Sequence, residues 1–159
     1  MSNDSAPFSD RPNRLPWPPM ILVLALFGGY LLQNSYPTGI AFPGNTRLIG
    51  GGVIALALLI DVAAMYTLWR GRTTILPNQK SDNLVASGIF RLSRNPIYVA
   101  NVLLIIGFAL RWSNAWLFLL APLAGLATQE LAIKREEKHL EAQFGDEYLS
   151  YKSRVRRWL

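Results

Sequence analysis

The sequence predicts an all-α integral membrane protein with about four transmembrane helices, the last two in a tight hairpin, and a cytoplasmic C-terminal amphipathic helix. Two observations predict this class. First, 51% of the 159 residues are hydrophobic and only 16% are charged, whereas soluble domains carry about a quarter charged residues. Second, the hydrophobic residues form long blocks with cations beside them. Cations in such positions fix membrane topology, so the net charge of +6 does not indicate a nucleic-acid partner.

The N-terminal part predicts a tail followed by two spans. Residues 1–16 are polar and rich in proline, and we expect a disordered cytoplasmic tail. Residues 17–69 contain two apolar blocks, at about 17–33 and 48–69, and we expect two transmembrane helices there. The stretch between the two blocks is rich in Pro and Gly, which is typical of a turn.

The next two spans are expected to form an antiparallel hairpin. Apolar residues run over 97–112, break at Ser113-Asn114, and resume over 115–133. Two apolar helices joined by so short a turn lie side by side and return the chain to the face from which it came.

The C-terminal tail predicts an amphipathic helical stripe, and its second helix, after Gly145, is expected to lie on the cytoplasmic membrane surface. Gly145 is expected to end one helix and Asp146 to cap the next. We expect Arg154, Arg156 and Arg157 to face lipid phosphates. Apolar residues recur at helical spacing along this tail: Leu140, Phe144, Tyr148, Tyr151 and Val155.

The distribution of cations predicts the orientation. Of the 16 Lys and Arg residues, only Arg47 and Arg111 fall on one side of the proposed spans. An even number of spans with this bias places both termini in the cytoplasm, which in a bacterium means a multi-pass protein of the inner membrane.

Composition and local sequence exclude several kinds of site. The chain has no Cys and one His, so it cannot form disulfides or a multi-histidine metal site, and no metal is predicted. Gly50-Gly51-Gly52 lacks the Lys-Ser/Thr of a phosphate loop and indicates close helix packing. Asp61 lies within a span, either as a substrate contact or as a protonated side chain bonded to a neighbouring helix near Gln129.

Two polar clusters are expected to meet at the cytoplasmic end of the hairpin. Asn95 is suited to cap the helix that begins at Pro96, and Arg94 beside this N-terminus would attract an anion. The hairpin would bring Arg94 and Tyr98 near the Glu136-Glu137 pair. The alternative is structural: the arginines are topology anchors, and the glutamates balance neighbouring cations on a solvated helix face.

Four sequence blocks resemble the isoprenylcysteine carboxyl methyltransferase superfamily, which includes phospholipid methyltransferases. The resemblance covers about residues 68–157, and the upstream stretch 71–74 looks like the loop that precedes its first motif. The blocks are Ser87-Gly88-Ile89-Phe90-Arg91, Arg94-Asn95-Pro96-Ile97-Tyr98, Arg135-Glu136-Glu137-Lys138-His139-Leu140, and Phe144-Gly145-Asp146-Glu147-Tyr148 with Tyr151-Lys152.

The resemblance implies a methyltransferase core over residues 70–159 that binds S-adenosylmethionine without a soluble nucleotide-binding domain. It implies catalytic roles for Arg94, Tyr98 and Glu137. Asn95 stands where the eukaryotic prenylcysteine enzymes have His, which affects the expected substrate more than the cofactor. The residues implied in cofactor binding are Leu84, Gly88, Phe90, Asn95 and Glu136.

The methyl acceptor is expected to be a lipid-like small molecule that arrives laterally between the spans. A carboxylate acceptor needs no base, whereas an amine or thiol would need one, and Glu137 or His139 could serve. Two alternatives stay open. The first is an NADPH-dependent enzyme like the sterol reductases, and the second is a non-catalytic membrane accessory protein. The oligomeric state is not predicted.

Overall fold

The computed structural model describes residues 17–40, 42–71 and 83–159. The predicted tail, 1–16, and most of the loop at 71–74 lie outside the described residues. Within the described part the chain is helical and contains no strand. This agrees with the all-α prediction.

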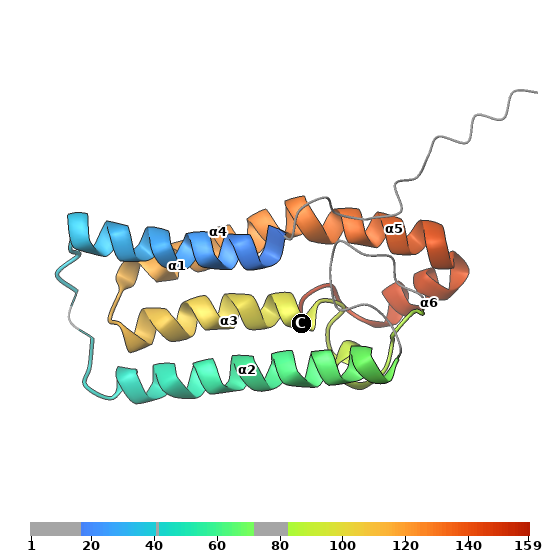
Figure 1. The fold of residues 1–159 in the computed structure, drawn as a ribbon, viewed down its shortest axis with the longest axis horizontal. Coiled ribbons are helices and arrows are strands. Elements are labelled where there is room, and N and C mark those ends of the chain that lie inside the picture. Colours follow the sequence, from blue (N-terminus) through green and yellow to red (C-terminus); the bar gives the residue numbers. More distant parts are fainter. Residues whose placement is uncertain (1–16, 41, 72–82) are drawn as a thin grey trace, which may run out of the picture.

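Four helices lie side by side in a bundle (Figure 1): α1 (Trp17–Ser35), α2 (Thr46–Arg70), α3 (Pro96–Arg111) and α4 (Ala115–Thr128). Helix α3 is central, because it packs against α2 on one side and against α1 and α4 on the other. Helices α3 and α4 form the predicted hairpin. Their connection lies at the end of the bundle opposite α5 and α6 (Figure 1).

The chain continues from α4 without a break in helical structure. A π-helical turn, Gln129–Ile133, joins α4 to α5 (Lys134–Phe144), and α6 (Asp146–Arg154) follows. Gly145, with φ +50°, separates α5 from α6 as predicted. Asp146 is the first residue of α6 and not its cap, because Gly145 holds the N-cap position.

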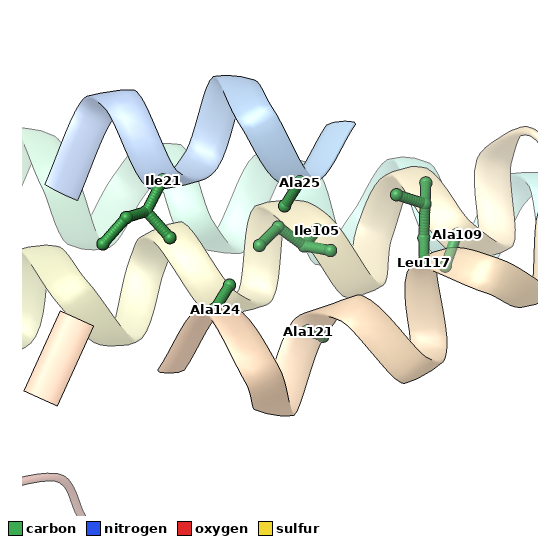
Figure 2. Packing of buried hydrophobic residues seen from close by; sticks show 7 residues of the cluster. All are labelled: Ile21, Ala25, Ile105, Ala109, Leu117, Ala121 and Ala124. Carbon is green, nitrogen blue, oxygen red and sulfur yellow. The ribbon is translucent and has the colours of Figure 1, made fainter. Parts of the chain in front are cut away.

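Small residues pack at the centre of the bundle and large ones face outward. Figure 2 shows the core between α1, α3 and α4, where alanines lie close to three larger aliphatic side chains. Leu117 and Ala109 are fully buried, whereas Leu24 and Leu59 are each more than 60% exposed, at 64% and 66%. Outward apolar faces on α1, α2 and α4 are what lipid requires of a membrane protein.

Asn114 ties the hairpin to α1. Its Oδ1 accepts a hydrogen bond from the Trp116 amide at 3.0 Å and so caps α4. Its Nδ2 donates to the Gly29 carbonyl of α1 at 2.8 Å. These bonds satisfy a side chain that is only 3% exposed, so the turn is fixed against α1.

Two helices are long and apolar enough to cross a bilayer: α2, with 25 residues, and the continuous Ala115–Phe144, with 30. Helix α3 is apolar but has only 16 residues, which corresponds to about 24 Å. The structure therefore supports a membrane protein, and the crossing by all four helices stays a prediction.

Helices α2 and α3 approach closely at a pair of glycines, as the glycine run predicts. A Cβ on Gly50 would lie 2.7 Å from the Gly107 carbonyl oxygen, and one on Gly107 would lie 3.1 Å from the Ile54 nitrogen. Gly51 and Gly52, by contrast, have open space around them. Only the first glycine of the run serves packing.

We expect Gly50→Ala to destabilise the bundle by about 1–3 kcal/mol, because the added methyl group must push the backbone of α3 away. Thermal unfolding in detergent measures the change, with Gly51→Ala as the matched control. Equal unfolding temperatures for the two variants would contradict this packing.

Candidate functional site

Helix α3 begins at the candidate site without the usual capping hydrogen bond from a side chain. Pro96 occupies the first turn, as predicted, and Asn95 is at the N-cap. The Asn95 side chain makes no capping hydrogen bond, so that prediction is wrong. Its Nδ2 instead donates to the Arg157 carbonyl at 2.9 Å, while its backbone amide donates to Ser93 Oγ at 3.1 Å.

An ionic cluster lies where the two predicted groups of residues meet. Arg94 Nη1 is 3.1 Å from Glu137 Oε1, and both side chains are 10% exposed. Arg157 approaches the same carboxylate with two donors, Nε to Oε1 at 2.8 Å and Nη2 to Oε2 at 2.7 Å. Arg94 Nη1 also donates to the Tyr148 hydroxyl at 3.3 Å. The hairpin therefore brings Arg94 to the glutamate pair as expected.

The two arginines hold Glu137 ionised. Burial by itself raises the pKa of Glu137, but hydrogen bonds from Arg157 and the charges of Arg94, Arg157 and Lys152 outweigh it, so the pKa is lowered. Burial and the Glu137 charge raise the pKa of Tyr148, which stays neutral. Glu137 is thus a weaker base than an ordinary carboxylate and is suited to an electrostatic role.

Glu136 forms a hydrogen bond with Tyr98, the tyrosine of the Arg94–Tyr98 block. The Tyr98 hydroxyl donates to Glu136 Oε1 at 2.6 Å, and Tyr98 is 8% exposed. The bond connects the first turn of α3 to the first turn of α5. The neighbouring glutamates therefore bind different residues of the Arg94–Tyr98 segment: Tyr98 contacts Glu136, and Arg94 contacts Glu137.

The predicted cofactor loop packs against the C-terminal end of α2. It contains a short 3₁₀ turn, Gly88–Arg91, that begins at Gly88 with φ +56°. A Cβ on Gly88 would meet Thr67 Oγ1 at 2.7 Å, so only glycine fits both the dihedral angle and the space. The Phe90 carbonyl accepts a hydrogen bond from the Tyr151 hydroxyl at 2.7 Å, which links this loop to α6. Leu84 is half-buried in the same loop.

The C-terminal strap, residues 155–159, completes the cluster and was not predicted. Its backbone pairs with the start of α3, because the Arg94 amide donates to the Arg156 carbonyl at 3.0 Å. The Trp158 indole donates to Gln129 Oε1 at 3.0 Å, on the π-helical turn. The prediction that Arg157 faces lipid phosphates is wrong, since Glu137 binds it. Val155, which was placed on the helical stripe, lies beyond the end of α6 in extended conformation.

An open groove of about 690 Å³ gives access to this cluster from the side of α5 and α6. Cations outnumber carboxylates in its lining, so it suits an anionic group. The lining residues are Lys134, Glu137, Lys138, Glu141, Ala142, Lys152 and Arg157.

Two other candidates lie outside the cluster. His139 Nε2 is buried without a hydrogen-bond partner in the described part of the chain. Asp61 Oδ1 is likewise buried without a described partner. Gln129 Oε1, the neighbour expected for Asp61, accepts from Trp158. Among the described residues no group of three or more His, Cys, Asp and Glu side chains could hold a metal ion.

The helical bundle and its charged cluster lie largely within a region that is similar to a known family. The profile described as "Phospholipid methyltransferase" matches residues 45–147, which include every predicted site residue. The chain belongs to the phospholipid methyltransferase family, and it is a membrane methyltransferase by that relationship.

Two relatives are similar to parts of the chain. An uncharacterized protein of Haemophilus influenzae is 38% identical over 63 residues, which are 40% of this chain and the whole of that protein. The phosphatidylethanolamine N-methyltransferase of Schizosaccharomyces pombe is 30% identical over 128 residues, which are 78% of this chain and 14% of that enzyme. No solved structure matches significantly.

Proposed function

We propose that the protein transfers the methyl group of S-adenosylmethionine to a lipophilic acceptor at the membrane surface, and that the first candidate acceptor is the amine of a phospholipid headgroup. One observation carries the proposal: the hairpin joins Arg94, Tyr98, Glu136 and Glu137 into one cluster within the part that matches the family. The fission yeast relative's name supports an amine acceptor.

The donors of the cluster fit the proposed cofactor. Arg94 Nε is buried and has no hydrogen-bond partner among the described residues. An unpaired buried donor costs about 1–3 kcal/mol, which a bound acceptor group would recover. The carboxylate of S-adenosylmethionine would be such a group. Backbone groups of the loop from Leu84 to Phe90, with Gly88 in its turn, would bind the remainder.

When bound, S-adenosylmethionine supplies an electrophilic methyl group on its sulfonium centre. The chain's own part is to align the acceptor in line with that methyl group and to exclude water. A headgroup ammonium must lose its proton before the nitrogen can attack. We assign this proton to the Glu136–Tyr98 pair, because the two arginines make Glu137 a poor base.

The proposed topology places the cluster at the cytoplasmic face. Four crossings with cations concentrated at one end would put both termini in the cytoplasm. The cofactor would enter from the aqueous side through the groove at α5 and α6. The acceptor would reach the cluster from the bilayer.

Transfer of a radiolabelled methyl group to lipid tests the proposal. Membranes containing the protein are incubated with S-[methyl-³H]adenosylmethionine, and the lipid extract is treated with mild base. We expect label that stays with the headgroup, as N-methyl groups do. Label released as volatile methanol would indicate a carboxylate acceptor, and no label in lipid with the folded protein would contradict the proposed reaction. The NADPH-dependent alternative predicts heat of binding for NADPH in calorimetry.

A further inference from the structure

The C-terminal strap contributes an arginine that lies outside the family match yet contacts the centre of the cluster. Arg157 makes two hydrogen bonds to Glu137, whereas Arg94 makes one ion pair with it. Because both carboxylate oxygens are bound by Arg157, Glu137 is fixed in one orientation. The matched region ends at residue 147.

The position of Arg157 is set by its own backbone. The Arg157 carbonyl accepts from Asn95 Nδ2 at 2.9 Å and from Ser93 Oγ at 3.4 Å. The neighbouring Arg156 carbonyl accepts from the Arg94 amide. The strap is therefore held by hydrogen bonds from three consecutive residues, 93–95, which directly precede α3 and include Arg94 of the cluster.

One donor of Arg94 stays unpaired in this cluster. Its Nη1 is engaged by Glu137 and Tyr148, but its Nε, buried in the same cluster, has no described acceptor. Arginine and carboxylate groups prefer paired, two-bond contacts. Without Arg157, Glu137 would be free to move from Nη1 to the Nε–Nη2 edge of Arg94. A two-bond contact on that edge would consume the Nε donor.

We infer that Arg157 is a positioning residue that binds Glu137 so that Arg94 keeps its Nε–H available for the anionic end of the ligand. The inference rests on the proposed function, in which that end is the carboxylate of S-adenosylmethionine. Arg157 itself does not contact the reacting atoms. It acts by preorganising the donor, so its removal weakens recognition of the carboxylate more than recognition of the rest of the ligand.

A comparison of two ligands isolates this effect. S-adenosylhomocysteine and its decarboxylated analogue differ only in the carboxylate group, and their dissociation constants are measured by calorimetry on the full-length protein in detergent. For the wild type we expect the analogue to bind at least tenfold more weakly, because a hydrogen bond to a charged group is lost. For Arg157→Gln we expect this ratio to fall to about threefold or less.

Three further variants make the result specific. Arg157→Lys keeps the charge but not the two-donor geometry, and we expect an intermediate ratio. Arg154→Gln removes an exposed cation of α6 and should leave the ratio unchanged. Arg94→Gln should abolish the ratio even though Arg157 is present.

The outcomes separate this inference from the proposed function. If the folded wild type binds neither ligand, the proposed function fails. If the wild type discriminates between the ligands and Arg157→Gln keeps the same ratio, the positioning role is wrong. Equal weakening of both ligands in Arg157→Gln would show a general structural role and would overturn the positioning role. A lower fraction of binding-competent protein with unchanged dissociation constants would do the same. Tighter binding in Arg157→Gln would mean that the strap obstructs the site.

Discussion

The substitution Glu137→Gln is expected to destabilise the protein by about 3 kcal/mol and to abolish methyl transfer. The amide removes the negative charge between Arg94 and Arg157 and leaves two cations facing each other. Breaking a buried ion pair costs about 3–5 kcal/mol. We expect the lower end, because Arg157 is 32% exposed and water can partly solvate it. Thermal unfolding in detergent measures the loss, and Glu147→Gln, at an exposed position of α6, is the control.

The pH dependence of the same variant gives a second measurement. The pKa of Glu137 lies below its ordinary value of 4.5, so the carboxylate stabilises the folded protein fully above pH 4.5 and this contribution is lost as pH falls through the lower folded value. The pKa of Arg157 and that of Tyr148 are both raised, so neither group titrates in this acidic range. The difference between wild type and Glu137→Gln should therefore shrink below pH 4.5. A constant difference down to pH 3 would contradict the ionised state of Glu137.

The substitution Tyr98→Phe is expected to reduce the rate of methyl transfer about 10- to 100-fold. It removes the hydroxyl that donates to Glu136 at 2.6 Å, and a hydrogen bond to a charged group contributes about 1.5–3 kcal/mol. Because the ring stays in place, packing should change little. The rate is measured with saturating cofactor in lipid vesicles.

The control for Tyr98→Phe is Tyr36→Phe, which alters an exposed tyrosine at the opposite end of the bundle. Its rate should equal that of the wild type. A Tyr98→Phe enzyme within twofold of the wild-type rate would remove Tyr98 and its bond to Glu136 from the mechanism.

The helices and the meeting of the two clusters could be predicted because both follow from local signals. Apolar blocks broken by Pro, Gly and Ser113-Asn114 mark the helices, and a short turn between two of them brings the ends of the hairpin together. The end of the fourth span was placed at residue 133, whereas the helix continues to Phe144. Hydropathy reports the surroundings of a segment, so it changes at Lys134 even though the backbone stays helical.

The details of the site depended on contacts that no local signal contains. Asn95 has the side chain of a good cap, but its Nδ2 donates to the Arg157 carbonyl of the C-terminal strap and its side chain makes no capping bond. Arg157 was assigned to lipid because it lies in a run of cations, and its partner Glu137 is 20 residues away across the reversal at Gly145. The π-helical turn at Gln129–Ile133 has no distinctive sequence, although such turns are frequent at functional sites.

Equilibrium binding of radiolabelled S-adenosylmethionine to the purified protein tests most directly whether the hairpin builds a cofactor site. We expect saturable binding by the wild type and by Glu147→Gln, and a loss of at least tenfold in affinity in Glu137→Gln and in Arg94→Gln. The absence of saturable binding to the folded wild type, or undiminished affinity in both cluster variants, would contradict the proposed site.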